Sequence, residues 1–248
     1  MSSIDTLIAS YHDQGFVTLE GVLSPEELLA LQQRMSDVAS GDAEFPLELI
    51  EFEPGADRVP RKINRCAEND DIFMTHAMNP RILDVVEQLI GPDIKLYSSQ
   101  CFMKPPGGVE KPWHQDSAYF TIAPRALVTC WTALDAVTID NGCLWVIPGS
   151  HKGELYDHRQ PWQVGDRVDM QVPEGDFNNR QEASIVMPAG SCSFHHSMLL
   201  HRSGANQTDQ PRRGLAVHYV ASRSRWTDPA QPQPEFQLLR GREYEGCV

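Results

Sequence analysis

The chain is organised around the stretch Trp113-His114-Gln115-Asp116. Within it a histidine and a carboxylate stand two positions apart, and on a β-strand two such side chains leave the same face of the sheet. Imidazole nitrogen and carboxylate oxygen together suit a divalent metal of intermediate hardness such as Fe(II). Two protein ligands are too few to hold such a metal, so we expect the rest of the chain to supply a third.

His201 is the candidate for this third ligand. Two histidines and one carboxylate would occupy one face of an octahedron and leave three positions for substrate chemistry. Arg212 follows eleven residues later, after a polar, turn-rich linker, and residues 214–220 have the pattern of a strand. This pattern predicts a hairpin with a metal ligand at one end. Its return strand would carry a guanidinium suited to grip a carboxylate with two hydrogen bonds.

Other histidines compete for the third ligand position. His195 and His196 end a strand-like run, and one of the pair can face the interior of the protein. We favour His201, because only it is followed by a Ser-Gly-x-Asn sequence and by Arg212. His196 could then support the ligands from behind, whereas His218 is expected to be a core residue.

Length, charge and cysteine usage restrict the class of protein. A chain of 248 residues is expected to form one domain, 1–248, with a full core. The 34 acidic and 21 basic residues give a net charge of −13, which argues against a nucleic-acid partner. Residues 1–5 lack signal-peptide features and no apolar run is long enough to span a membrane, so we expect a cytoplasmic protein without a membrane partner. The six cysteines form no CxxC pair and are expected to be buried thiols in a reducing compartment.

Helical signals dominate the first part of the chain, about 1–93. Ser24, Pro25 and Glu27 form a strong helix start with a capping box, and the apolar pattern continues to about residue 39. A second helix is expected from Asn79-Pro80 to a stop at residues 91–92. Residues 15–19 are β-prone and residues 40–60 look irregular. The basic cluster that follows is expected to be a solvated loop; it consists of Arg58, Arg61, Lys62 and Arg65.

Short β-prone runs separated by Gly and Pro turns follow from residue 94 to residue 221. Such a pattern predicts a sandwich or jelly roll, with residues 222–248 as a tail packed on its outside. The long connection 153–183 is expected to be a functional loop or lid. The predicted strands are residues 94–103, 127–134, 143–147, 184–187, 192–194 and 215–221.

With these stretches together, the chain resembles the phytanoyl-CoA dioxygenase family of Fe(II)/2-oxoglutarate oxygenases. The resemblance covers roughly residues 10–221, apart from residues 40–60 and 153–183. It implies a mainly β protein with flanking helices, built on a double-stranded β-helix, the cupin-like jelly roll. The matching stretches are residues 104–106, 114–116, 131–133, 141–152 and 201–206, together with Arg212.

The resemblance also implies a set of site residues. Fe(II) would be bound by His114, Asp116 and His201, and the distal carboxylate of 2-oxoglutarate by Arg212. Neighbours on a strand face opposite ways, so Arg213 should then face outward. Ser203 could add a hydroxyl to that carboxylate. Three further residues are expected near the cosubstrate by their match to relatives: Gln115, Trp131 and Lys62.

The reaction implied is oxidation by O2 with release of succinate and CO2. An intact Asp116 favours hydroxylation of an unactivated C–H bond, or a desaturation or ring closure, because related halogenases carry a small residue there. A small metabolite or natural-product intermediate is the expected substrate, and a monomer or homodimer the expected state. Tyr119 and Phe120 would pack in the core or contact substrate, and Lys104 would be a surface charge.

Two other classes remain open from the sequence. One is a non-catalytic jelly-roll protein that binds a metal or ligand. The other is a cupin-like metalloenzyme that uses no 2-oxoglutarate. Arg212 argues against both, because neither needs a clamp for a cosubstrate carboxylate.

Overall fold

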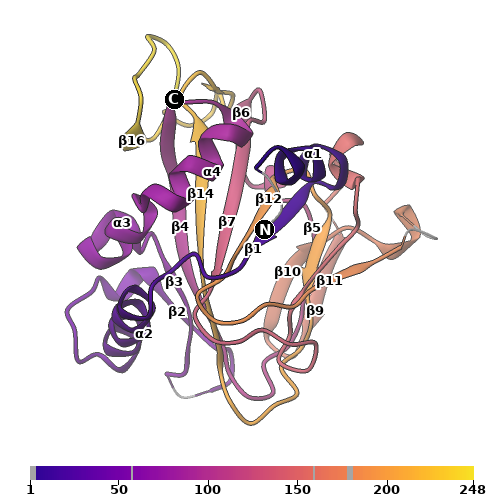
Figure 1. Cartoon of the computed structure of the whole chain (residues 1–248). Helices are drawn as coiled ribbons and strands as arrows, with labels where there is room; N and C mark the ends of the chain where they lie inside the picture. The colour runs from indigo at the N-terminus through magenta and orange to yellow at the C-terminus, as the bar shows by residue number, and fades with distance from the viewer. Residues whose placement is uncertain (1–3, 57, 159, 178–180) are drawn as a thin grey trace.

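The computed structural model describes residues 4–56, 58–158, 160–177 and 181–248. Two antiparallel sheets form its core, and helices cover the outer face of the larger sheet (Figure 1). This arrangement is the jelly roll expected from the sequence. Among the described residues, no helix is long and apolar enough to cross a membrane.

The larger sheet has the strand order β1-β12-β7-β14-β4-β3-β2, with β16 paired to β4. Neighbours in this list are far apart in the sequence, so the sheet is held by long-range pairing. The strands are β1 (Phe16–Leu19), β2 (Ile50–Phe52), β3 (Pro60–Asn64), β4 (Ile94–Lys104), β7 (Leu127–Ala133), β12 (Cys192–His196), β14 (Arg212–Ala221) and β16 (Leu238–Arg240).

The smaller sheet has the order β11-β8-β13-β5, and two separate strand pairs complete the β structure. Its strands are β5 (Lys111–His114), β8 (Leu144–Val146), β11 (Ala183–Ile185) and β13 (His201–Ser203). The separate pairs are β6 (Ile122–Ala123) with β15 (Arg225–Trp226), and β9 (Gln160–Val164) with β10 (Arg167–Gln171).

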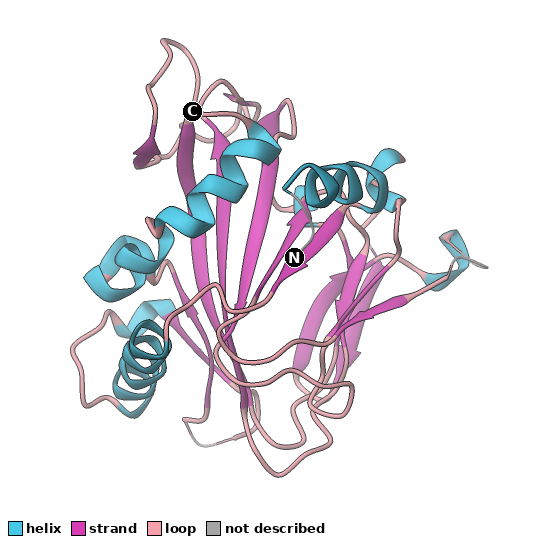
Figure 2. Cartoon of the chain, viewed as in Figure 1, coloured by secondary structure: helices cyan, strands magenta, loops and turns pink. Residues whose placement is uncertain are grey.

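Four α-helices lie in the first part of the described chain, and Figure 2 shows them on the outside of the sheets. The predicted capping box is present: Ser24 Oγ accepts from the Glu27 amide at 3.2 Å, and the Glu27 carboxylate accepts from the Ser24 amide at 2.6 Å. The helices are α1 (Ile4–Gln14), α2 (Pro25–Ser40), α3 (Asp71–Ala77) and α4 (Pro80–Ile90). Short 3-10 turns are η1 (Leu47–Leu49), η2 (Ala67–Asn69), η3 (Asp116–Ala118), η4 (Ser150–Lys152) and η5 (Glu174–Asp176).

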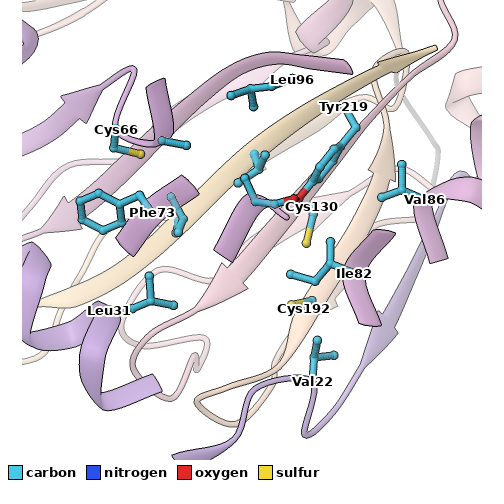
Figure 3. Packing of buried hydrophobic residues seen from close by; sticks show 14 of the residues in the cluster. Val22, Leu31, Cys66, Phe73, Ile82, Val86, Leu96, Cys130, Cys192 and Tyr219 are labelled. Carbon is cyan, nitrogen blue, oxygen red and sulfur yellow. The ribbon is translucent and has the colours of Figure 1, made fainter. Parts of the chain in front are cut away.

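The main hydrophobic core lies between these helices and the larger sheet. Figure 3 shows Leu31, Phe73 and Ile82 from the helices facing Cys130 and Tyr219 from the sheet. The Tyr219 hydroxyl donates to the carbonyl of Ala77 at 3.0 Å, so the one polar atom of this large side chain is satisfied. Burial of an apolar layer on one face of the sheet leaves the opposite face free for polar side chains.

Strand alternation places the polar residues on that opposite face. In β7, Val128 and Cys130 belong to the core against the helices, whereas Thr129 and Trp131 line an internal cavity. In β14, Ala216 and His218 likewise line the cavity. The period of two along a strand therefore separates the core from the candidate site. The cysteines follow the prediction: all six are free, and only Cys247 is not buried.

The structure corrects several sequence-based expectations. β13 and β14 do not form a hairpin, because β13 pairs with β5 and β8 in the smaller sheet and β14 pairs with β4 and β7 in the larger one. The turn-rich linker between them is a crossover between sheets. Residues 50–64 contain β2 and β3 where we expected irregular chain and a solvated loop, and 153–183 contains the β9–β10 hairpin. The helices α1 and α3 were not predicted.

Candidate metal and cosubstrate site

Two histidines meet at the junction of β5 and β13. His114 and His201 are directly opposed in the antiparallel register, and their ring centroids lie 4.1 Å apart. His114 Nδ1 contacts the carbonyl of Pro112 at 2.8 Å, and His201 Nδ1 contacts that of Leu199 at 2.9 Å. Each carbonyl fixes the Nδ1–H tautomer, so both Nε2 atoms are free to act as ligands.

Asp116 completes the group, although it lies in η3 and not on a strand as expected. Gln115 between the two ligands is extended, with φ −121° and ψ 132°, so Asp116 still points to the same side as His114. Its Oδ1 atom lies 3.8 Å from His114 Nε2 and 3.6 Å from His201 Nε2.

The geometry and protonation of the three side chains fit a divalent metal. Their ligand atoms lie within 4.8 Å of one another, and all three residues are buried. Ligands about 2.1 Å from a common metal are about 3 Å apart, so small inward rotations of these side chains reach coordination distance. Burial lowers the pKa of His201 to about 4 and that of His114 well below its usual value, which keeps both imidazoles neutral. Two neutral imidazoles and one carboxylate on one side, with the cavity on the other, match the facial triad of non-haem Fe(II).

The larger sheet supports the carboxylate from behind. Thr129 Oγ1 donates to Asp116 Oδ2 at 2.8 Å, and His195 Nε2 lies 3.5 Å from the same oxygen. His218 Nδ1 in turn contacts Thr129 Oγ1 at 2.9 Å. Although burial opposes it, the proximity of His201 and the contact with His195 hold the pKa of the Asp116 carboxyl well below its usual range. Oδ1 is thereby left to face the two histidines.

Replacing Thr129 with valine should test this support, because the shape is kept and the donor to Asp116 Oδ2 is lost. We expect affinity for Mn(II), an air-stable probe for Fe(II), to fall by about ten- to a hundredfold, as when a metal ligand loses its hydrogen-bond partner. Electron paramagnetic resonance of free Mn(II) measures the affinity. Thr129→Ser should bind like the parent. Equal affinity in Thr129→Val and the parent would show that the hydroxyl has no part in the site.

The structure shows which of the competing histidines face the cavity: His195 and His201 line it, and His196 does not. His195 faces the cavity and approaches Asp116, whereas His196 lies on the other face, with its ring 6.2 Å from that of Tyr11 and 5.4 Å from that of His151. The supporting role considered for His196 was therefore wrong, and His195 occupies that place. Neighbouring residues on a strand face opposite ways, and the sequence did not show which of these two histidines faces the cavity.

Arg212 is a buried cation that faces the same cavity. Only 3% of its surface is exposed, and burial lowers its pKa to about 10. Its Nη2 donates to the carbonyl of Gly142 at 2.9 Å, and its Cζ lies 5.2 Å from the centre of the Trp131 ring. Among the described residues its Nε has no hydrogen-bond partner, and no carboxylate forms an ion pair with it. The Arg212 guanidinium is thus buried, lies against the Trp131 ring and has hydrogen-bond donors without a protein partner among the described residues. Such a group fits the carboxylate of a ligand.

The neighbouring Arg213 faces away from the cavity, as expected. Its guanidinium donates twice to Asp135, at 3.0 and 2.7 Å, and its Nη1 lies 3.1 Å from the Ser36 hydroxyl of α2. Among the described residues, Arg212 therefore faces the cavity without a carboxylate partner, whereas Arg213 faces outward and forms an ion pair with Asp135.

Lys104 was expected to be a surface charge, and this was wrong. It is opposite Arg212 in the β4–β14 register, and its Nζ donates to Ser203 Oγ at 2.9 Å and to the carbonyl of Gly204. Burial, and then the nearby Arg212, lower the pKa of Lys104 to about 6. Ser203 and Lys104 both line the cavity beside the Arg212 guanidinium. The only sequence signal was the Lys-Pro-Pro stretch, which said nothing of burial.

Trp131 and Lys62 also line the cavity. Lys62 Nζ lies 3.5 Å from Glu51 and 5.7 Å from the centre of the Phe102 ring. The structure brings both residues to the cavity that contains Arg212.

Gln115 does not line the cavity, which contradicts its expected place near the cosubstrate. Its side-chain amide donates to the carbonyl of Met198 at 2.7 Å, and its Oε1 accepts from the amide of Tyr156 at 2.8 Å. The extended backbone that points both metal ligands inward necessarily turns Gln115 outward. Its side chain instead fastens the start of the segment 153–183.

The cavity has a volume of about 390 Å³ and connects these groups. Besides the metal triad and Arg212, its wall includes Tyr119 and Phe120 after β5 and residues of β10. A cavity of this size, with apolar side chains and convergent polar groups in its wall, is typical of a small-molecule site. The strand β10 contributes Arg167, Val168 and Asp169.

Comparisons with known proteins agree with this geometry. The model of the phytanoyl-CoA dioxygenase family matches residues 11–214. Mouse peroxisomal phytanoyl-CoA dioxygenase is 30% identical over 227 residues, which cover 86% of this chain and 67% of that protein. A probable alpha-ketoglutarate-dependent hypophosphite dioxygenase of Stutzerimonas stutzeri is 28% identical over 86% of this chain and 77% of its own length.

Two solved structures show the same fold. EctD from S. alaskensis, with 2-oxoglutarate and 5-hydroxyectoine, has a TM-score of 0.79 at 23% identity and covers 100% of this chain and 86% of its own. The alpha ketoglutarate-dependent epimerase SnoN from nogalamycin biosynthesis has a TM-score of 0.77 at 22% identity. It covers 96% of this chain and 99% of its own.

Proposed function

Because this chain belongs to the phytanoyl-CoA dioxygenase family and is an iron- and 2-oxoglutarate-dependent dioxygenase, we propose that His114, Asp116 and His201 hold its Fe(II). Arg212 binds the distal carboxylate of 2-oxoglutarate, with Ser203 beside it. The observation that carries this assignment is the convergence of three neutral or anionic metal donors and one unpaired, buried guanidinium on a single cavity.

We propose that the reaction is hydroxylation of an unactivated C–H bond. Iron with 2-oxoglutarate supplies the O2 activation, in which the cosubstrate becomes succinate and CO2. The intact Asp116 supports hydroxylation, desaturation or ring closure over halogenation. A metalloenzyme without 2-oxoglutarate and a non-catalytic binding protein are set aside by the family membership.

The protein's own residues bind, orient and shield. The carbonyls behind His114 and His201 hold the rings so that Nε2 points into the cavity, and Thr129 turns Asp116 so that Oδ1 does. Arg212, fixed on the Trp131 face, gives the cosubstrate one direction. Such pre-set geometry lowers the entropy lost when the reactants meet.

We further propose that the substrate is a small metabolite or natural-product intermediate, and that residues 1–248 act as one catalytic domain. The cavity volume of about 390 Å³ supports a small substrate. The packing of the N-terminal helices on the sheet that carries Thr129, His195 and Arg212 supports a single unit.

Two measurements test the proposed function together. Calorimetry without oxygen should show 2-oxoglutarate binding to the Mn(II)-loaded protein, and the iron-loaded protein should release succinate from 2-oxoglutarate in air. A protein that binds iron but neither binds nor consumes 2-oxoglutarate would contradict the proposal.

The segment 153–183 should act as a lid, but only in part. The amides of Tyr156 and Val172 are bonded to Gln115 and to the carbonyl of Trp113, so they should exchange slowly with or without ligands. The amides of β9 and β10 should exchange faster in the empty enzyme and slow down when metal, cosubstrate and substrate are bound. Hydrogen-exchange mass spectrometry measures this. Equal and strong protection of the hairpin in both states would contradict a lid.

A further inference from the structure

Positive charge gathers around the cavity of a strongly acidic protein. The chain carries a net charge of −13. The cavity wall nevertheless has more basic than acidic side chains, even before Asp116 is assigned to the metal. The basic residues are Arg61, Lys62, Lys104, Lys111, Arg167 and Arg212, and the acidic residues besides Asp116 are Glu51, Glu53 and Asp169.

The carboxylates of the wall are shared among these cations. Glu51 lies 2.5 Å from Arg61 and 3.5 Å from Lys62. Asp169 forms an ion pair with Lys111 and lies 3.9 Å from Arg167, beyond hydrogen-bond distance. One carboxylate therefore serves two cations in each case, which leaves positive charge uncompensated.

Among the described residues, Arg167 has few protein partners. Only 14% of its side chain is exposed, and its Nε is buried without a hydrogen-bond partner among the described residues. The Trp162 ring of β9 lies 5.6 Å from its Cζ and holds it on one side. Burial and the nearby Arg61 lower its pKa. A buried guanidinium with free donors is costly unless a ligand completes its hydrogen bonds.

The β9–β10 hairpin holds Arg167 beside the metal strand. Val172, just after β10, donates to the carbonyl of Trp113 in β5 at 2.8 Å, and Asp169 pairs with Lys111 at the other end of β5. Lys111 Nζ also lies 3.5 Å from the Tyr119 hydroxyl, and the Tyr119 ring lies 6.2 Å from that of the metal ligand His114. A group bound at Arg167 and Lys111 would thus be separated from the metal by Tyr119.

We propose that the substrate is an anion whose carboxylate or phosphoryl group binds to Arg167 and Lys111 between β10 and β5. This inference rests on the proposed function and names the substrate class of the same cavity. Arg212 binds the carboxylate of the cosubstrate, and Arg167 binds the anionic group of the substrate. Oxyanion binding by a planar guanidinium and an ammonium orients the rest of the substrate past Tyr119 toward the metal.

Calorimetry of the full chain, saturated with Mn(II) and 2-oxoglutarate in the absence of oxygen, tests the proposal. The probes are hexanoate, hexyl phosphate and hexan-1-ol, which share an alkyl chain and differ in the head group. At least one anion should bind about tenfold or more tightly than hexan-1-ol, as expected for a charge-assisted hydrogen bond. The tighter of the two anions identifies the head group. Binding of hexan-1-ol as tight as either anion, or no binding of either, would overturn the proposal.

Two variants separate ligand binding from support of the hairpin. Arg167→Gln should weaken the anions about tenfold and leave hexan-1-ol unchanged. Asp169→Asn removes the competing carboxylate and should strengthen anion binding severalfold. If both variants weaken all probes alike, Arg167 only holds the hairpin and the proposal fails. Arg125→Gln, an exposed arginine outside the cavity wall, is the control and should bind as the parent does.

The same experiment keeps the two proposals apart. 2-Oxoglutarate is titrated first, so its failure to bind contradicts the proposed function itself. Normal binding of 2-oxoglutarate followed by probes without any preference for anions contradicts only the anion site.

Discussion

Replacement of His201 with alanine is expected to abolish metal binding and turnover while the fold remains intact. In the proposed site His201 supplies one of three ligand atoms, and loss of a partner behind a ligand already costs about ten- to a hundredfold. Loss of the ligand itself should therefore cost more than about a hundredfold in Mn(II) affinity and in succinate release. His114→Ala and Asp116→Ala should behave alike, because the site cannot spare a ligand. Mn(II) titration and circular dichroism of each variant measure affinity and fold separately.

His196→Ala is the matched control for this experiment. It removes a histidine of β12 whose ring lies near those of Tyr11 and His151, on the face of the larger sheet that does not line the cavity. We expect metal affinity and turnover close to those of the parent. Normal activity in His201→Ala together with loss of activity in His196→Ala would show that the wrong histidine was assigned.

The convergence of His114, Asp116 and His201 follows largely from information that is local in the sequence. His114 and Asp116 are two residues apart, and any extended backbone between them sends both side chains to one side. His201 needed long-range pairing of β13 with β5, but its identity was marked by the residues that follow it and by Arg212. The capping box at Ser24 was equally local, and it formed as predicted.

Features that depend on the register between distant strands could not be predicted. Lys104 is half-buried in the cavity wall because β4 pairs with β14 and places it opposite Arg212, and no local pattern contains that register. The hairpin expected between His201 and Arg212 was wrong for the same reason. A polar, turn-rich linker has the same sequence pattern whether it joins two strands of one sheet or connects two sheets.

The β9–β10 hairpin shows a different limit. Its strands carry mixed polar and apolar residues, and burial alternates in β10 only because Arg167, Asp169 and Gln171 turn toward the protein. The sequence marked 153–183 as a functional segment by its length alone. Which of its charges face the cavity became clear only from their neighbours Lys111 and Trp162.

Arg212→Ala should raise the concentration of 2-oxoglutarate needed for half-maximal turnover. A charge-assisted pair in a dry site contributes on the order of 1.5–3 kcal/mol, so we expect about a ten- to hundredfold increase. Metal affinity should change little, because the guanidinium contacts Gly142 and Trp131 and none of the metal ligands. Succinate release against 2-oxoglutarate concentration, with a parallel Mn(II) titration, measures both quantities.

Two further variants decide whether the effect belongs to the guanidinium of this residue. Arg212→Lys should recover only part of the affinity, since an ammonium cannot form two parallel hydrogen bonds or stack on Trp131 as a planar group does. Arg213→Ala should leave the cosubstrate requirement unchanged and lower stability instead, because it breaks the pair with Asp135. If Arg213→Ala raised the required 2-oxoglutarate concentration and Arg212→Ala did not, Arg213 and not Arg212 would face the cavity. No effect from either would mean that the cosubstrate carboxylate is bound elsewhere, and Lys104, opposite Arg212 and bonded to Ser203, would then be the next cation to replace.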